Sequence, residues 1–272
     1  MKFGERINLH THTARCKHAS GRMEEYCRAA RDAGVRVLGW SDHTPFPDAR
    51  IAHIRMDWNE FPEYLTDLDD MRRKFPDLEI FTGVEIDFFP DLGRSFYEDH
   101  FNPERGVFYR IGGPHFNAPD LDRFAVFSHR EVRRYVDSVL ELMQTGLFDY
   151  IAHPDFFMAR CLRWDSEVAA LAAEMARAAK DLSIPLEINT NGLRKPPIDS
   201  ADGRRPPYPY RPFWELMGEY GVRMVIGSDA HAPEDVWSQM EEAEALGAQC
   251  RLTPCNHELA EIIRKRAASV RQ

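Results

Sequence analysis

Short apolar runs of strand length alternate along the chain with stretches of helical periodicity, and this alternation restricts the possible folds more than any other feature. Seven such runs occur, at residues 7–10, 35–41, 78–86, 109–112, 150–152, 186–189 and 223–227. Helical periodicity is most regular at 132–143 and at 168–182, where Asp165 or Ser166 is the expected N-cap, and we also expect helices at 23–33 and 234–246. Strands that alternate with helices in this way form a mostly parallel α/β sheet, open or closed.

The length of the chain suits one α/β barrel as well as two small domains. The 272 residues are enough to bury a large core, and 43% hydrophobic with 29% charged residues is ordinary for a globular chain. The proline-rich stretch 195–212 is expected to be an ordered loop, because no repeat, low-complexity tract or long linker accompanies it. We therefore predict a single domain that spans residues 1–272.

Charge, hydropathy and cysteine usage indicate the expected cellular location and partners. The longest apolar runs are far shorter than the roughly 20 residues of a membrane span, and residues 1–6 lack the apolar core of a secretion signal. The five cysteines are odd in number and form no CxxC pair, so we expect reduced thiols and a cytoplasmic protein. A net charge of −9 without a basic run argues against nucleic acid as a partner, but suits several bound divalent cations. The oligomeric state stays open.

The histidines and carboxylates of interest fall at the ends of the predicted strands. In α/β sheets and barrels, binding groups collect where parallel strands reach their carboxyl ends. Nine residues lie at or just beyond these ends: His10, His12, His18, His43, Glu85, His115, His153, Asp229 and His231. By contrast, His53, His100, His129 and His257 are scattered over other segments and are assigned no role. We expect the nine residues to meet along one rim of the sheet.

This combination of side chains predicts a metal site. The spacing of His10 and His12 places both imidazoles on one face of an extended chain, and Asp229 and His231 share the same spacing. Imidazole nitrogen mixed with carboxylate oxygen suits zinc, iron or manganese and disfavours a calcium cage. A single histidine is usually an ordinary core or surface residue, so the prediction depends on the joint placement.

Five short motifs carry a resemblance to a known family. They are Asn-Leu-His-Thr-His at 8–12, Ser-Asp-His at 41–43, Gly-Val-Glu at 83–85, Pro-His-Phe at 114–116 and Gly-Ser-Asp-Ala-His at 227–231. Together they resemble the signatures of the polymerase and histidinol phosphatase (PHP) family over nearly the whole chain. Residues 16–26 and 187–196 resemble segments of its histidinol-phosphate phosphatase branch and distinguish the chain from polymerase PHP domains.

The resemblance implies a distorted seven-stranded (β/α)7 TIM-like barrel and a site for three divalent metal ions. The implied ligands are His10, His12, Glu85 and Asp229 for the first ion, Glu85, His115 and His153 for the second, and His18, His43 and His231 for the third. The chain departs from the pattern at Asn8, where many relatives carry aspartate, and Asn8 is expected to support its neighbours instead. Asp42 is either a further ligand or an orienting partner of His43, and we favour the second.

The implied activity is hydrolysis of a small phosphomonoester, with L-histidinol phosphate as the expected substrate. The nucleophile would be a hydroxide bridging two metal ions, flanked by their ligands Glu85 and Asp229. Arg160 and Arg194 follow the fifth and sixth strands and are candidates for phosphate contact, because a guanidinium offers two parallel donors.

Other readings of the same site remain. The substrate could be another small phosphomonoester or a nucleotide, and a non-catalytic metal-binding protein is a third alternative. Asp87, Asp155 and the pair Phe88-Phe89 are candidates for contact with the organic part of the substrate, although the two phenylalanines fit a core position better. The leaving-group acid has no identifiable candidate.

Overall fold

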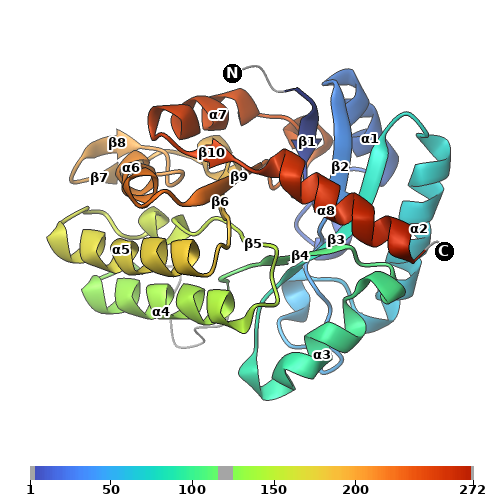
Figure 1. The fold of residues 1–272 in the computed structure, drawn as a ribbon, viewed down its shortest axis with the longest axis horizontal. Helices are drawn as coiled ribbons and strands as arrows, with labels where there is room; N and C mark the ends of the chain where they lie inside the picture. The colour runs from blue at the N-terminus through green and yellow to red at the C-terminus, as the bar shows by residue number, and fades with distance from the viewer. Residues whose placement is uncertain (1–3, 116–124, 271–272) are drawn as a thin grey trace.

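The computed structural model describes residues 4–115 and 125–270, and among these residues eight parallel strands form one sheet (Figure 1). The strand order is β1-β2-β3-β4-β5-β6-β9-β10. The strands are β1 (Arg6–Asn8), β2 (Val35–Trp40), β3 (Glu79–Ile86), β4 (Tyr109–Gly112), β5 (Tyr150–Ile151), β6 (Leu186–Asn189), β9 (Arg223–Gly227) and β10 (Thr253–Pro254). Phe116, the last residue of the predicted fourth motif, lies outside the described residues.

The two sides of the sheet approach each other beyond the ends of β1 and β9. Thr11 and Ala230 form an isolated parallel bridge, and the His12 backbone N–H donates to the Ala230 carbonyl at 3.0 Å. The Ser228 backbone N–H also donates to the Asn8 side-chain oxygen at 3.2 Å. All seven predicted strands are present, and the expected α/β fold of TIM-like type is confirmed. The eighth strand, β10, pairs with β9 and was not predicted.

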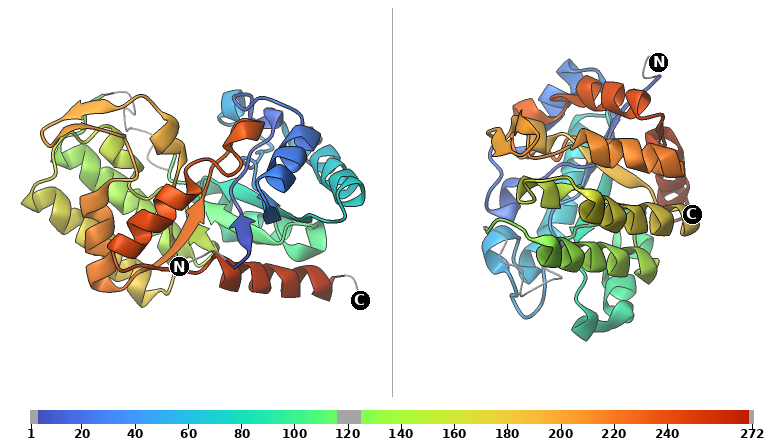
Figure 2. Two further views of the ribbon diagram at one scale, coloured as in Figure 1. Left: turned by 90° about the horizontal axis from the view of Figure 1, so that it is seen from above. Right: turned by 90° about the vertical axis from the view of Figure 1, so that its left-hand side faces the viewer.

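Helices pack around the sheet and connect successive strands (Figures 1 and 2). They are α1 (Met23–Asp32), α2 (Phe61–Lys74), α3 (Gly93–His100), α4 (His129–Thr145), α5 (Ser166–Asp181), α6 (Arg211–Tyr220), α7 (Met240–Gln249) and α8 (Asn256–Ser269). The predictions of α1, α4 and α5 are confirmed, and Asp165 caps α5 by accepting from the backbone N–H groups of Glu167 and Val168.

The predicted helix at 234–246 is wrong in its first half. A short 3₁₀ helix, η8 (Pro233–Asp235), stands there instead, and α7 begins at Met240. The interruption has a backbone cause, because Gln239 has a φ of 55° in the left-handed region, which cannot continue a right-handed helix.

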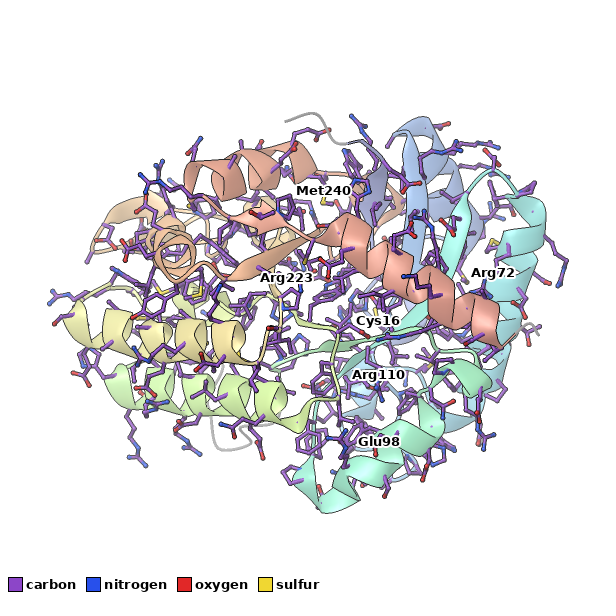
Figure 3. All side chains as sticks on the ribbon, in the orientation of Figure 1. Cys16, Arg72, Glu98, Arg110, Arg223 and Met240 are labelled. Atoms are coloured by element: carbon purple, nitrogen blue, oxygen red, sulfur yellow. The ribbon has the colours of Figure 1, made fainter. Side chains whose placement is uncertain are left out.

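The C-terminal helix α8 lies across the amino ends of the strands (Figures 1 and 2). Its residues Leu259 and Ile263 are buried in a cluster with residues of the strand interior. Arg264 forms ion pairs with Glu5 at 3.1 Å and with Glu79 at 2.5 Å, at the starts of β1 and β3. Side chains fill the space between this helix and the strands (Figure 3), so the opposite, carboxyl end of the sheet is the end available for a site.

Tyr109 fills the interior of the sheet. It is 1% exposed, and its hydroxyl donates to the Leu9 carbonyl at 2.8 Å. Gly39 and Gly83 make room for the ring, since a Cβ at Gly83 would lie 2.2 Å from a Tyr109 ring carbon. The Tyr109 ring therefore fills the space enclosed by the strands next to Leu9, just before His10 and His12.

The proline-rich stretch 195–212 is not a loop over its whole length, because it contains a β-hairpin. Strands β7 (Ile198–Ser200) and β8 (Gly203–Arg205) pair in antiparallel fashion outside the main sheet. Arg205 joins this hairpin to the segment after β5 by donating to the carbonyls of Met158 at 2.9 Å and Cys161 at 3.1 Å. Throughout the described part of the chain, no helix has both the length and the apolar character needed to cross a membrane.

Candidate metal centre

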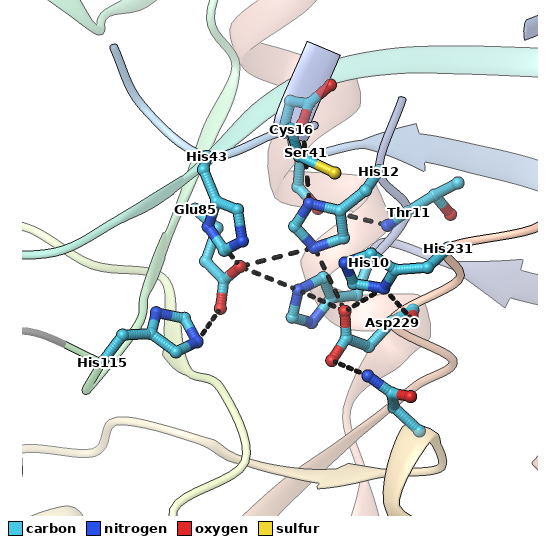
Figure 4. Close-up of polar contacts among 12 residues, drawn as sticks. His10, Thr11, His12, Cys16, Ser41, His43, Glu85, His115, Asp229 and His231 are labelled. Atoms are coloured by element: carbon cyan, nitrogen blue, oxygen red, sulfur yellow. Dashed lines mark hydrogen bonds and ion pairs between the residues drawn. The ribbon is translucent and has the colours of Figure 1, made fainter. Parts of the chain in front are cut away.

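The nine predicted site residues meet at the carboxyl end of the sheet. Figure 4 shows His10, His12, His43, Glu85, His115, Asp229 and His231. His10 and His12, just beyond β1, point their Nε2 atoms at the same carboxylate oxygen, Oε2 of Glu85, at 3.4 Å each. The two Nε2 atoms also lie 3.6 and 3.1 Å from Oδ1 of Asp229, which follows β9. Two imidazoles and two carboxylates from three strands therefore converge on one point.

Glu85 faces a second group with its other oxygen. Its Oε1 lies 3.5 Å from His115 Nε2 and 3.3 Å from His153 Nε2, and these two nitrogens are 3.0 Å apart. Its Oε2 lies 3.1 Å from His43 Nδ1. Because one carboxylate reaches three histidines that follow β2, β4 and β5, Glu85 stands between two clusters of nitrogen atoms.

The third predicted group lies on the more open side of the site. His18 and His231 approach to 2.9 Å between their Nε2 atoms, and their rings stack. His43 comes close to His231 together with His12, whereas His18 and His231 are grouped with the thiol of Cys16. The structure therefore brings His18, His43 and His231 to one region. His231 belongs to both groups, whereas His18 and His43 belong to one group each.

The donor atoms fit divalent cations. His10 Nε2, His12 Nε2, His43 Nδ1 and Glu85 Oε1 are buried and have no hydrogen-bond partner among residues 4–115 and 125–270. Buried polar atoms without partners are costly, and bound cations would satisfy these lone pairs. Mixed imidazole and carboxylate donors are the ligand type of zinc, iron and manganese. Several overlapping groups of these donors could each hold an ion, and the number and identity of the ions remain predictions.

Charged side chains behind the site set its electrostatics. Burial opposes protonation of His12, but Asp229 and Asp42 outweigh it and raise the pKa of His12 to about 9. Burial likewise opposes ionisation of Glu85, but His115 and His10 hold its pKa well below the usual range. Glu85 therefore stays ionised and provides negative charge that favours cation binding.

Glu187 on β6 supports two of the site histidines, a role that the resemblance of residues 187–196 does not indicate. Its Oε1 lies 2.8 Å from His10 Nδ1, and its Oε2 accepts from the His153 backbone N–H at 3.2 Å. The first contact leaves the Nε2 atom of His10 directed into the site, and the second holds the backbone of His153. A carboxylate behind an imidazole is the usual support of a metal-binding histidine.

Asp42 supports a different histidine from the one expected. It lies 3.6 Å from His12 Nδ1 and accepts from the backbone N–H and the hydroxyl of Thr13. The prediction that Asp42 orients His43 is therefore wrong. The Asp42 carboxylate points toward His12 and Thr13, which follow β1. The supporting role expected of Asn8 fits its contacts, since its amide donates to Ser228 Oγ at 2.7 Å and to the Val236 carbonyl at 2.9 Å.

Asp229 is held by the segment after β6. Its φ of 49° is unusual for a residue other than glycine, so the turn needs support. Asn189 and Asn191 donate to its Oδ2 at 3.2 and 3.1 Å, which leaves Oδ1 to face His10 and His12.

Arg194 contacts the same turn of the backbone. Its guanidinium donates to the carbonyls of Ser228 at 2.7 Å and Asp229 at 3.2 Å, and it forms an ion pair with Asp235. The donors of Arg194 are thus engaged beside Asp229.

A cavity of about 800 Å³ opens over the cluster, and Arg160 is one of its lining residues. Two residues suggested for contact with the organic part of a substrate are engaged with protein groups. Asp87 pairs with buried Arg55 at 2.9 Å and accepts from the His115 backbone N–H at 3.1 Å, so it lies beside the cluster. Asp155 accepts from the Tyr210 backbone N–H at 2.7 Å. Phe88 is 8% exposed and belongs to the core, as expected.

The fold and the cluster define an α/β protein with a histidine and carboxylate site suited to several divalent ions. The chain belongs to the PHP family, since the family model described as the PHP domain matches residues 8–191. It is 32% identical to a probable histidinol-phosphatase of Deinococcus radiodurans over 86% of this chain and 89% of that protein. The expected class, a metal-dependent phosphatase of the PHP family, is confirmed.

Two solved structures share the fold. A histidinol phosphate phosphatase of Lactococcus lactis, solved with zinc, L-histidinol and phosphate, aligns with a TM-score of 0.71 at 16% identity, over 92% of this chain and 95% of that one. A putative histidinol phosphatase of Listeria monocytogenes aligns with a TM-score of 0.67 at 19% identity, over 87% of this chain and 99% of that one. At these identities the likeness concerns the fold.

Proposed function

We propose that the chain hydrolyses L-histidinol phosphate to L-histidinol and phosphate with three divalent ions bound at the cluster. The observation that carries the proposal is the position of Glu85, whose two oxygens face separate groups of histidine nitrogens. A carboxylate in that position suits two neighbouring cations, the arrangement that recurs in phosphoester hydrolases. The substrate is proposed from the Deinococcus relative and from the ligands of the Lactococcus structure.

The proposed ligand sets follow the clusters of nitrogen and oxygen atoms. They are His10, His12, Glu85 and Asp229; then Glu85, His115 and His153; then His18, His43 and His231. Ions bound there would supply Lewis acidity and lower the pKa of a water molecule to near neutrality. Glu85 and Asp229 would flank the point of attack, and Glu187 would keep His10 correctly oriented.

The two predicted phosphate-binding arginines differ in position. Arg160 lines the cavity and suits the contact with phosphoryl oxygens that we propose for it. Arg194 would have to release the Ser228 and Asp229 carbonyls to make such a contact. We therefore propose that Arg194 positions Asp229, and that Arg160 is the principal arginine for phosphate.

The proposal includes the organisation and setting expected from the sequence. We propose that residues 1–272 act as one domain and that the protein works in the cytoplasm, with a small phosphomonoester as its partner rather than nucleic acid. All five cysteines are unpaired and buried, which suits a reducing compartment.

Phosphate release from L-histidinol phosphate and from a panel of nucleotides tests the function. We expect the metal-loaded protein to prefer histidinol phosphate by at least about tenfold in kcat/KM. Glu85→Gln should abolish turnover and lose at least two of the proposed ions. Glu104→Gln, at an exposed glutamate, is the matched control. A preference for a nucleotide would replace the proposed substrate. Full metal loading without hydrolysis of any phosphoester would favour a non-catalytic metal-binding protein.

A further inference from the structure

Two aromatic rings form one side of the cavity beside the His115 and His153 end of the cluster. Phe156 and Tyr208 both line the cavity, with their ring centroids 5.3 Å apart and tilted by 59°. The Phe156 ring lies 5.5 Å from the ring of His153. Phe156 is half-buried, whereas Tyr208 is only 3% exposed and packs against it. We call Phe156 and Tyr208 the aromatic wall.

The two halves of the aromatic wall come from segments far apart in the sequence, and Arg205 joins them. Phe156 begins the short 3₁₀ helix η6 (Phe156–Ala159), and Tyr208 follows the β7–β8 hairpin. Arg205 donates to the Met158 carbonyl at 2.9 Å on one side and to the Pro207 carbonyl at 3.1 Å on the other. The wall is therefore fixed to both segments rather than carried on one loop.

Close packing also restrains Tyr208 from the other side. A Cβ at Gly192 would lie 2.2 Å from the Tyr208 carbonyl oxygen and 2.5 Å from its ring. The backbone after β6 thus touches Tyr208 directly, and a larger residue at Gly192 would displace it. A ring held in this way presents a fixed surface, which favours recognition by shape because little entropy is lost on binding.

We propose that the aromatic wall selects phosphomonoesters whose alcohol carries a planar unsaturated ring close to the ester oxygen. This inference rests on the proposed function, because it takes the phosphoryl group to lie at the histidine cluster. A group joined to that phosphoryl by a few single bonds would reach the neighbouring Phe156 ring. Aromatic faces favour planar partners in stacked or edge-on contact over saturated rings of equal size.

Binding of two matched phosphonates tests the aromatic wall without requiring turnover. Benzylphosphonate and cyclohexylmethylphosphonate carry the same charged group and differ in the planarity of the ring. By calorimetry on the metal-loaded protein we expect benzylphosphonate to bind roughly three- to tenfold more tightly. Phe156→Leu should reduce this ratio to about one, and Phe156→Tyr, which keeps a ring, should retain it. The Kd of inorganic phosphate should stay unchanged in both variants.

Phe96→Leu provides the matched control, because Phe96 is a half-buried phenylalanine that packs against Phe46 and Trp58 on another part of the chain. It should leave the ratio of the two phosphonates as in the wild type. Equal binding of both phosphonates to the wild type, or an unchanged ratio in Phe156→Leu, would overturn the inference. Loss of histidinol phosphate turnover with an intact phosphonate ratio would instead reject the proposed substrate and leave the aromatic wall standing.

Discussion

The buried carboxylate of Glu187 lies 2.8 Å from Nδ1 of His10 and thereby turns the Nε2 atom of that ring toward Glu85. Both Glu187 and His10 are fully buried. A charge partner in such a place fixes the tautomer and the orientation of the imidazole and increases its basicity as a ligand. The geometry of the metal centre therefore depends on a strand residue that is not itself a proposed ligand.

Glu187→Gln should weaken metal binding while the fold is retained. Glutamine keeps the size of the side chain but removes its charge, so His10 loses its anionic partner. We expect metal affinity to fall by roughly 10- to 100-fold, measured by equilibrium dialysis with elemental analysis. Glu104→Gln removes a charge at an exposed position and should have no effect. Metal affinity equal to that of the wild type would show that His10 needs no such partner.

Arg194→Lys should separate a positioning role from phosphate binding. Lysine keeps the charge but cannot hold the carbonyls of Ser228 and Asp229 together as the guanidinium does. We expect kcat to fall by roughly tenfold, with the inhibition constant of inorganic phosphate unchanged, because Asp229 loses its support. A large rise in that inhibition constant with unchanged kcat would assign Arg194 to the phosphate instead.

Arg160→Ala should lower turnover more strongly than Arg194→Lys in the same assays. Arg160 lines the cavity, and removal of a charge-assisted contact to a phosphoryl group lowers turnover by about 100-fold or more. Metal content should remain at the wild-type level, because Arg160 is not a ligand. Unchanged kinetics in Arg160→Ala would remove this arginine from the mechanism.

Asp155 should make a distinct contribution to stability as pH changes. Burial raises the pKa of Asp155 to about 6, above the usual value of 3.8. Asp155 therefore loses its proton at lower pH in the unfolded chain than in the folded protein. Its contribution to the free energy of unfolding is fully present below pH 3.8, decreases as the pH rises, and is lost above about pH 6.

Asp155→Asn removes this titration and provides the test. Between pH 5 and pH 7, the free energy of unfolding of the metal-free variant should rise relative to the wild type by about 1.4 kcal/mol, the equivalent of one pH unit for one proton. Urea unfolding of both proteins at the two pH values measures the difference. A difference that does not change with pH would show that Asp155 is ionised throughout this range.

The sequence allowed the seven main strands and the convergence of nine site residues to be predicted, because both depend on local patterns. Apolar runs mark buried parallel strands, and residues at the carboxyl ends of such strands must share one rim. The role of Glu187 could not be derived in that way. The resemblance of residues 187–196 gives Glu187 no partner, and its contact with His10 arises because β6 pairs with β9, which meets the segment after β1.

Short elements held by tertiary contacts were also missed. The β7–β8 hairpin lies in a proline-rich stretch with little strand propensity, and Arg205 fixes it to carbonyls of the segment after β5. The start of α7 could not be predicted, because Gln239 adopts a left-handed backbone conformation that is unusual for glutamine. The engagement of Arg194 with the Asp229 turn likewise needs the three-dimensional structure, since the two residues are 35 positions apart.

The number of ions bound per chain tests the central claim most directly, because the claim is that the histidine and carboxylate groups around Glu85 hold divalent metals together. Native mass spectrometry of gently purified wild-type protein and of Glu85→Gln gives this number without reference to any substrate. We predict three divalent ions per chain in the wild type and loss of at least two in Glu85→Gln, because both of its oxygens face ligand groups. A folded wild-type protein that binds no divalent ions, or a Glu85→Gln variant that keeps the full complement, would contradict the account.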